Sequence, residues 1–500
     1  MSASRRSRWR APGARISEPD SRSRHRASRD AGAVARDSSV SDTPHLSFPV
    51  VAPGGGIHPN DPRSPVSAHP VADLTHGDRA SAELPDVLVV GSGLFGLSTA
   101  LHLARAGRRV TVVDEGTPAS GTTAAGAGFV GLWAAGYAWY WNESERDLEQ
   151  YGIDFYRELA GTADIGFRDR GNVWLSVTDE GYRDHILPFD RHPLKPAGAR
   201  LLTPDEVAQV VPGVSAAAVT GGFLHPGGIQ ISAPDAALAL AAEVARAGVR
   251  FENCTPVASV LVEDGRTVGV RTTAGAELRA GQVVLASGSW TNALLSPLGR
   301  TLPFARVLAS RLTTKPFGLG QIPTLMLPEL QGLWVREHRG GLTYGHGGGY
   351  EALGSADVTA ERRPQRTDLI DAMREQLAPV LAALIPSGGD YADTAEWTQG
   401  VVSMTADRRF IAGPVPEAAD LWVVAGDNES GVTHGPGLGR LVADLVTGAP
   451  PVAGDPALYR PDRFDGVDYD VADEAAVGRA MPARREVDAL RTSRIPAAAS

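Results

Sequence analysis

The residues of this chain best suited to bind a ligand are three regularly spaced glycines and an acid that follows them in the sequence. They are Gly91, Gly93 and Gly96 in the sequence GSGLFG, and Asp114 follows 18 residues after the last of them. Between a strand and a helix, the first glycine permits a tight turn, the second lets backbone approach a pyrophosphate, and the third lets the helix pack on the strand. A carboxylate at this distance accepts from a ribose hydroxyl and repels a 2′-phosphate. The pattern predicts a dinucleotide site for FAD or NAD rather than NADP.

The surrounding sequence supplies the elements that must position this site. Residues 86–90 are an apolar, β-branched run typical of a strand buried on both faces. Apolar residues then recur at helical spacing from Leu97 until Gly107 ends the helix. A second strand at 110–113 leads directly to Asp114. Strand, glycine turn, helix, strand and acid therefore occur in the order that a parallel α/β dinucleotide-binding unit requires.

Three later segments join apolar strands to turns of small residues. Residues 120–128 are all Gly, Ala, Ser or Thr and directly follow the second predicted strand. Residues 283–290 predict a buried strand that ends in a small-residue turn, and residues 404–435 contain a further strand at 421–425 between two loops. Small side chains let the backbone lie against a flat or charged ligand. The alternative for the first segment is an ordinary flexible loop.

Together these segments resemble the FAD-dependent D-amino-acid oxidase superfamily. Its members include glycine oxidase, sarcosine oxidases and dehydrogenases, dimethylglycine dehydrogenase and D-amino-acid dehydrogenase. The resemblance extends from about residue 84 to residue 464. It implies an α/β chain (α+β overall) with two interleaved lobes. These are a Rossmann-type FAD lobe with a parallel sheet (about 84–140, 225–300 and 397–464) and a substrate lobe with a mainly antiparallel sheet (about 141–224 and 301–396).

The resemblance also implies which residues hold FAD. Binding is expected to be noncovalent, because Gly400 and the loop 122–128 lack the cysteine or histidine that attaches the flavin in some members. We expect a helix near 435–437 and the backbone N–H groups of the loop 430–435 to stabilise negative charge on the reduced flavin. The residues assigned to the FAD site are Gly91, Gly93, Leu94, Phe95, Gly96, Asp114, Glu115, Thr122, Thr123, Gly126, Val257, Ser287, Gly288, Trp290, Gly413, Ser430, Gly431, Val432 and Thr433.

For activity, the resemblance implies oxidation of a CH–NH bond. Hydride leaves the carbon beside a neutral amine nitrogen for flavin N5, and water then hydrolyses the imine. The flavin performs the redox chemistry while the protein supplies position and electrostatics. One alternative is oxidation of a CH–OH substrate of the glycerol-3-phosphate or 2-hydroxyacid type, and another is a non-catalytic FAD-binding protein.

Three charged residues expected in the family are missing on the substrate side. Val402 replaces an arginine that clamps the substrate carboxylate in glycine-oxidase-like members. Thr433 and Thr343 replace two sarcosine-oxidase-type lysines, of which the second assists oxygen. The electron acceptor is therefore either oxygen or another molecule. The substrate either lacks a carboxylate or is bound by another arginine, with Arg336, Arg311 and Arg306 as candidates.

Aromatic and polar residues supply further candidates for the substrate lobe. Thr343, Tyr344 and His346 lie on a strand expected to cover the flavin ring, and we assign them as catalytic. Trp139 and Trp141 belong to an aromatic cluster that could bind a methylated amine by cation–π contact. We assign both, with Arg336, to substrate binding; the alternative for the cluster is packing beneath a helix at 143–159.

Composition limits the other possibilities. Lys and Arg number 48 against 58 Asp and Glu, and this net charge of −10 does not favour nucleic acid as a partner. The single cysteine, Cys254, excludes an internal disulfide framework and multi-cysteine metal sites, and we expect it to be a small buried hydrophobe. No apolar run is long enough to span a membrane. We expect a cytoplasmic enzyme without a metal; its oligomeric state stays open.

The two ends differ from the rest of the chain. Ten arginines lie within the first 36 residues among Ser, Ala, Pro and Asp. Such a composition cannot bury enough apolar surface to offset its ordering entropy, so we expect residues 1–82 to be a disordered tail. Residues 465–500 are also rich in Ala, Arg and Asp, and we expect them to be a loose extension.

Overall fold

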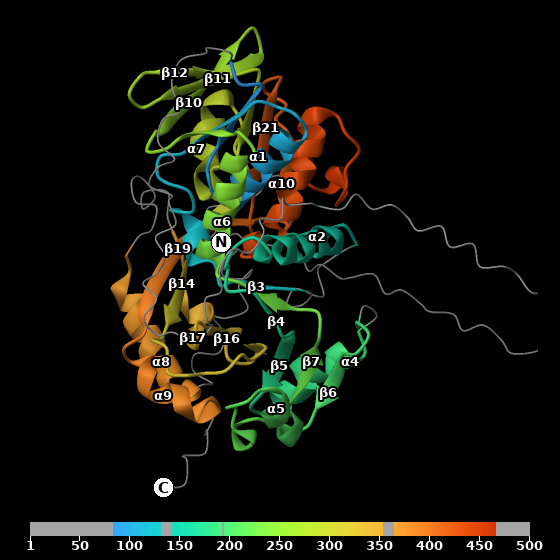
Figure 1. Ribbon diagram of the computed structural model, residues 1–500, viewed down its shortest axis with the longest axis vertical. Helices are drawn as coiled ribbons and strands as arrows, with labels where there is room; N and C mark the ends of the chain where they lie inside the picture. The colour runs from blue at the N-terminus through green and yellow to red at the C-terminus, as the bar shows by residue number, and fades with distance from the viewer. Residues whose placement is uncertain (1–83, 132–142, 193–194, 354–364, 467–500) are drawn as a thin grey trace, which may run out of the picture. The chain divides into compact units, whose positions relative to one another are not determined.

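The computed structural model describes residues 84–131, 143–192, 195–353 and 365–466, all of which fall in one compact unit (Figure 1). The predicted tail at 1–82, the aromatic residues Trp139 and Trp141, and the extension beyond 466 lie outside the described residues. Among the residues described, no helix combines the length and the apolar character needed to cross a bilayer.

A six-stranded sheet forms the first lobe. In spatial order its strands are β20 (Ile411–Pro414), β21 (Leu421–Ala425), β13 (Gln282–Leu285), β1 (Val87–Val90), β2 (Val110–Val113) and β9 (Arg250–Glu252). The pairs run parallel except at the edge, where β20 is antiparallel to β21. Every residue of β1 is buried because the sheet is covered on both faces, which explains its continuous apolar sequence.

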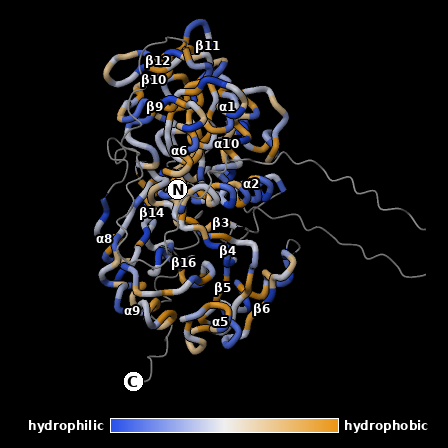
Figure 2. Tube along the Cα trace, in the orientation of Figure 1, coloured by the Kyte–Doolittle hydropathy of each residue, from blue (hydrophilic) through white to orange (hydrophobic). Residues whose placement is uncertain are grey.

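Four helices pack over one face of this sheet: α1 (Leu94–Arg105), α2 (Glu143–Ala160), α6 (Ala233–Arg246) and α10 (Gly431–Thr447). Figure 2 shows hydrophobic segments gathered around α1, α6 and α10, and more hydrophilic residues along α2. Residues 141–224 were expected to belong to the substrate lobe, but α2 packs on the first lobe instead. Its apolar stripe, including Leu148 and Phe155, lies in the core of the first lobe.

The opposite face is covered by a three-stranded antiparallel sheet and a short helix. They are β10 (Val257–Glu263), β11 (Arg266–Thr272), β12 (Glu277–Arg279) and α7 (Thr291–Leu295). The turn at Asp264 and Gly265 joins β10 to β11. Cys254 lies just before this sheet in a turn and is exposed, with a φ of 52°. The expectation of a buried cysteine is therefore corrected, because the chain leaves β9 for the surface at this point.

A nine-stranded, mainly antiparallel sheet forms the second lobe. Its spatial order is β18 (Tyr350–Ala352), β14 (Phe304–Thr313), β17 (Gly341–Gly345), β16 (Leu333–His338), β15 (Thr324–Leu327), β5 (Asn172–Ser176), β7 (Gly221–His225) and β6 (Arg200–Leu202), and β19 (Glu396–Thr405) also pairs with β14. Helices α8 (Thr367–Leu384) and α9 (Pro386–Ala392) cover part of one face (Figure 1). Because β19 belongs to this sheet, the chain returns to the first lobe after Thr405 rather than at residue 397.

Short elements complete the fold. A small sheet with the order β3 (Phe129–Val130), β8 (Ile229–Gln230) and β4 (Arg168–Asp169) follows the small-residue loop. Three short helices, α3 (Asp179–Gly181), α4 (Leu187–Asp190) and α5 (Pro204–Val210), lie near β5, β6 and β7. A capping box between Thr203 and Glu206 fixes the start of α5.

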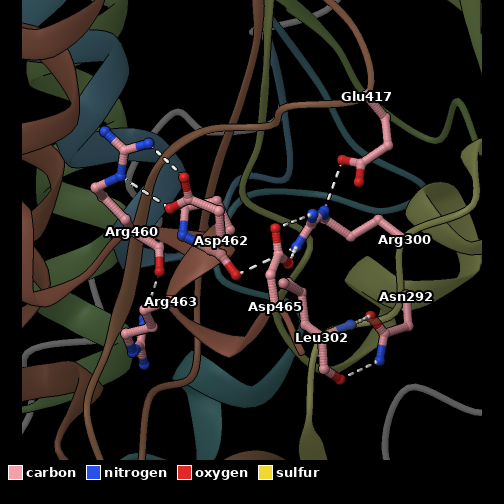
Figure 3. Close-up of polar contacts among 9 residues, drawn as sticks. Asn292, Arg300, Leu302, Glu417, Arg460, Asp462, Arg463 and Asp465 are labelled. Atoms are coloured by element: carbon pink, nitrogen blue, oxygen red, sulfur yellow. Dashed lines mark hydrogen bonds and ion pairs between the residues drawn. The ribbon is translucent and has the colours of Figure 1, made fainter. Parts of the chain in front are cut away.

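Polar contacts fix the point where the chain leaves the first lobe for β14. Arg300 donates through Nε to Glu417 at 2.6 Å and through Nη1 to Asp465 at 3.0 Å, as Figure 3 shows. The side-chain amide of Asn292 exchanges two hydrogen bonds with the backbone of Leu302, at 2.9 and 2.8 Å. Asp465 therefore belongs to the folded unit, one residue beyond the predicted boundary.

Candidate active site

A cavity of about 440 Å³ lies along the carboxyl ends of β1, β2 and β13 and reaches the first turn of α10. This is the edge at which open parallel sheets bind their ligands, and the volume is typical of a small-molecule site. The residues assigned to FAD from the sequence all line this cavity except Gly96 and Gly413. Sequence segments separated by more than 300 residues are thus brought to one site.

The glycine turn has the geometry that its sequence predicts. Gly91 has a φ of +112°, and a Cβ there would lie 2.3 Å from the carbonyl oxygen of Ala286. A Cβ on Gly96 would lie 1.9 Å from the oxygen of Gly91, so this glycine serves helix packing rather than the cavity wall. Gly93 at the N-cap has no side chain to cap α1, and the Leu94 N–H donates to the Thr123 hydroxyl at 3.3 Å, so the positive end of the helix faces the cavity beside the small-residue loop.

Asp114 is held in a fixed orientation at the end of β2. Its Oδ2 accepts from the backbone N–H of Ser92 at 2.7 Å and from the Ser92 hydroxyl at 2.9 Å. Its Oδ1 accepts from the N–H of Gly116 at 2.7 Å. The carboxylate is therefore oriented by the turn itself, beside Glu115 and Val257 on the cavity wall.

Small residues form a cradle around the middle of the cavity. At Gly121 and Gly288 an added Cβ would meet no protein atom within 4 Å, so side chains there would fill free space in the cavity. The Thr122 hydroxyl donates to the carbonyl oxygen of Val401 at 2.7 Å, which ties the loop 120–128 to β19. At Gly126 a Cβ would lie 2.7 Å from Val432, so the loop approaches α10 closely.

The helix at the far end of the cavity starts earlier than expected. It begins at Gly431 rather than near 435–437, so Val432 and Thr433 form its first turn and line the cavity. No side chain caps the helix at Ser430, and its positive end faces the ligand space. Helix α2 supports this turn from behind, because the Tyr156 hydroxyl donates to the carbonyl oxygen of Val432 at 2.7 Å.

Two carboxylates line this end of the cavity and were not assigned from the sequence. Asp427 accepts from the backbone N–H and hydroxyl of Ser403 at 2.9 and 2.8 Å, and burial raises its pKa above the usual value. Asn428 and Glu429 both have positive φ, 46° and 65°. The only signal in the sequence is the polar run after the strand at 421–425. The sequence does not show that the side chains of its two acids face the cavity, because their direction depends on the positive φ angles of this loop.

Tyr344, His346 and Thr343 do not line the cavity, in contrast to the expectation for catalytic residues. The Tyr344 ring is buried in the core of the second lobe, and its hydroxyl donates to Ala392 at 3.4 Å. His346 is buried and accepts at Nδ1 from the N–H of Gly348 at 3.2 Å. The Thr343 hydroxyl donates to the carbonyl oxygen of Leu312 at 2.9 Å.

Arg336 does not line the cavity either. Its guanidinium lies behind the small-residue loop and donates through Nε to the carbonyl oxygen of Ala127 at 2.5 Å. In the described part of the chain no arginine belongs to the cavity wall. The other predicted substrate residues, Trp139 and Trp141, lie outside the described residues.

The residues present fit FAD. An oriented carboxylate, a glycine turn at the start of a helix, a cradle of small residues and a second helix start lie along one cavity, and they suit the adenosine ribose, the pyrophosphate and the flavin end of FAD in that order. The ring would then lie near Gly128, Phe129, Val402 and the first turn of α10.

Comparisons with known proteins agree with this arrangement. A family model described as FAD dependent oxidoreductase matches residues 86–445. The chain is 30% identical over 387 residues to a glycine oxidase of Pseudomonas aeruginosa, covering 75% of this chain and 98% of that protein. It is 31% identical over 421 residues to a D-amino acid dehydrogenase of Methylobacterium nodulans, covering 73% and 96%. The crystal structure of glycine oxidase from Geobacillus kaustophilus superposes with a TM-score of 0.65 at 27% identity, covering 77% and all of that chain.

Proposed function

This chain belongs to the family of FAD-dependent oxidoreductases, and from that premise we propose that it oxidises the CH–NH bond of an amine or amino acid. The names of its relatives, glycine oxidase and D-amino acid dehydrogenase, support a substrate with an amine nitrogen. The proposal depends mainly on one observation: a continuous cavity joins the dinucleotide turn to a ring site that the second lobe borders. We infer that the substrate meets the flavin at that border.

The residues of this chain hold the cofactor and prepare its charge. FAD bound there supplies the acceptor for a hydride. The backbone N–H groups at the start of α1 would bind the pyrophosphate, and Asp114 would accept from a ribose hydroxyl. The first turn of α10, beginning at Gly431, would place a positive helix end against negative charge that develops on reduction.

The charges on the cavity wall favour a cationic amine over an anionic substrate. Asp427 and Glu429 line the ring end, whereas no arginine does so among the described residues. At neutral pH an amine approaches as its cation, and a carboxylate within a few ångströms lowers the free energy of that encounter complex. The substrate class we propose is therefore a secondary or tertiary amine that does not depend on a carboxylate clamp. The predicted contribution of Trp139 and Trp141 to its binding stays a prediction.

Anaerobic titration of the purified protein tests the proposal. Its visible flavin spectrum would be followed as sarcosine, dimethylglycine, D- and L-amino acids and larger N-methyl amines are added. We expect bleaching by one amine subclass, with an aldehyde, ketone or oxo acid and the demethylated or free amine as products. Bleaching by an alcohol or hydroxy acid, with a carbonyl product and no amine released, would instead establish the CH–OH alternative. A flavin that none of these compounds reduces would support the non-catalytic alternative.

The acid at the ring end supplies a more specific test. Glu429→Gln should weaken the binding of a cationic amine by several-fold, because it removes the negative charge from the cavity wall. The matched control is Glu263→Gln, on the exposed hairpin of β10 and β11. Equal affinity of both variants for the amine would contradict the assignment of Glu429 to substrate binding.

A second proposal concerns the molecule that reoxidises the reduced flavin. Thr343 stands where the resemblance expects an oxygen-assisting lysine, so we propose that the reduced enzyme transfers electrons to an acceptor other than oxygen. Stopped-flow mixing of the reduced protein with oxygen and with quinone or dye acceptors tests this. Faster reoxidation by oxygen than by every other acceptor would contradict it.

A further inference from the structure

Two arginines are buried behind the loop that forms the ring end of the cavity. Arg311 on β14 is 8% exposed, and Arg336 on β16 is 2% exposed. Strand β17 lies between β14 and β16, so the two side chains come from neighbouring positions of one sheet. The Arg311 charge further lowers the pKa of Arg336.

Among the residues that the structure describes, both guanidinium groups donate only to neutral oxygen atoms. Arg311 donates through Nη2 to Ala124 O at 3.0 Å, and through Nη1 to the hydroxyls of Thr313 and Thr343 at 3.1 and 3.3 Å. Arg336 donates through Nε to Ala127 O at 2.5 Å and through Nη1 to its neighbour's carbonyl oxygen at 2.9 Å. In the described part of the chain, neither arginine forms an ion pair with a carboxylate.

The positive charges persist despite their burial. Desolvation lowers the pKa of Arg311 to about 10 and that of Arg336 to about 9, so both remain cations at neutral pH. Glu337, whose charge raises the pKa of Arg336, already pairs with Arg168 at 3.2 Å and accepts from the N–H of Gly340 at 2.7 Å. Burying two like charges without carboxylate partners is unfavourable, and removing such charges often stabilises a fold. An anionic group nearby would offset that cost.

The cavity is the space next to these charges. Ala127 and Gly128 line the ring end of the cavity, while the oxygen of Ala127 accepts from Arg336 on the other side of the loop. At Gly128 an added Cβ would lie 2.7 Å from Nη2 of Arg336, so no side chain separates this backbone from the guanidinium. The positive charges are therefore one layer of backbone away from the ligand space.

We propose that Arg311 and Arg336 are positioning residues that hold the loop 124–128 by its carbonyl oxygens and stabilise the reduced form of FAD electrostatically. Reduction adds two electrons and one proton to the cofactor, so it leaves one additional negative charge at the ring. In a poorly hydrated site, a cation behind the loop lowers the free energy of that charge without being in contact with it. The proposal rests on the binding of FAD and is independent of which substrate supplies the electrons.

The reduction potential of the bound cofactor is the measurement that tests this assignment. Arg311→Met and Arg336→Met remove the charge and keep a side chain of similar length, whereas Arg336→Lys keeps the charge and loses the planar donors. The matched control is Arg374→Met, because Arg374 on α8 also donates to a backbone carbonyl oxygen, that of Ala395 at 2.7 Å, but does not border the cavity. Each holoprotein would be titrated anaerobically with dithionite and a reference dye, so no amine is needed.

We expect each methionine variant to lower the equilibrium constant for two-electron reduction at least tenfold, a shift of about 30 mV to more negative potential. Arg336→Lys should keep most of the potential and bind FAD more weakly, because the loop loses the hydrogen bond from Nε to Ala127. Arg374→Met should change neither quantity. If the methionine variants do not fold, Thr343→Asp places a carboxylate beside Arg311 and should lower the potential in the same direction.

Three results would overturn the proposal. One is an unchanged or more positive potential in methionine or aspartate variants that retain FAD. A second is an equal shift in Arg336→Lys and Arg336→Met, because the charge would then have no part in the effect. The third is an equal shift in Arg374→Met. A protein that behaves as proposed here but oxidises no amine would refute the proposed substrate and leave this assignment intact.

Discussion

The contact between α2 and the first turn of α10 gives a quantitative prediction at Gly152. A Cβ on this glycine would lie 2.1 Å from the carbonyl oxygen of Thr433, and a second backbone atom of Thr433 lies at 3.3 Å. Alanine stabilises an unobstructed helix by about 1 kcal/mol relative to glycine. Here the two helices must separate by roughly 1 Å to admit the methyl group, and overpacking of this kind costs about 1–3 kcal/mol. The cost exceeds the propensity gain, so Gly152→Ala should destabilise the protein by about 1 kcal/mol.

The same displacement should weaken cofactor binding, because Thr433 lines the cavity. A loss of about 1 kcal/mol corresponds to about fivefold weaker affinity for FAD. Urea unfolding of the apoprotein measures the first effect, and fluorescence titration of the apoprotein with FAD measures the second. Gly320→Ala is the matched control, because a Cβ at Gly320 meets nothing within 4 Å and its φ is ordinary, so it should be neutral or stabilising by about 0.4–1 kcal/mol. A Gly152→Ala variant that is more stable than the parent and binds FAD normally would contradict a close contact between α2 and α10 at this position.

Three further predictions follow from individual side chains. Asp114→Asn removes a charge-assisted hydrogen bond to the ribose, worth about 1.5–3 kcal/mol, and FAD titration should show affinity about ten- to a hundredfold weaker; an unchanged affinity would contradict the ribose assignment. Tyr156→Phe leaves the buried oxygen of Val432 without its donor at 2.7 Å, and urea unfolding should show a loss of about 1–3 kcal/mol. Burial lowers the pKa of His225 and of His346 to about 4, below the ordinary 6.5. Between these values the unfolded chain binds more protons than the folded one, so stability should fall as pH decreases from about 6.5 to about 4. His225→Gln should reduce that slope in urea unfolding, and an unaltered slope would contradict the prediction.

Local signals in the sequence were sufficient to locate the cofactor cavity. The glycine turn at Gly91 and the acid at Asp114 lie within one strand–helix–strand unit, so spacing alone fixes their relation. The small-residue loop and the segment at 430–433 were identified by resemblance, and the structure brings both to the same cavity.

The substrate side could not be predicted in the same way, because it depends on which face of a strand meets the cavity. Side chains alternate along β17, so Tyr344 points into the core packed by α8 while Thr343 points toward Arg311. On the Thr343 side, Arg311 donates to Ala124 in the loop 124–128, and this loop rather than β17 borders the cavity. Nothing in the sequence indicates that the loop lies there. The assignment of α2 to the substrate lobe was also wrong. Its apolar stripe predicts that one face of the helix is buried, but it does not indicate which of the two lobes buries it.

The strand order of the first lobe has a consequence during protein synthesis. Strand β1 pairs on one side with β2, which is translated soon after it, and on the other side with β13, which follows β2 by about 170 residues. At a translation rate of about 5–20 residues per second, the second edge of this apolar strand would wait about 10–30 s for its partner to emerge from the ribosome. Helix α10, which packs on α1, emerges later still. An unpaired apolar edge is a template for aggregation, so the nascent chain should depend on chaperones until residues beyond 285 have been made.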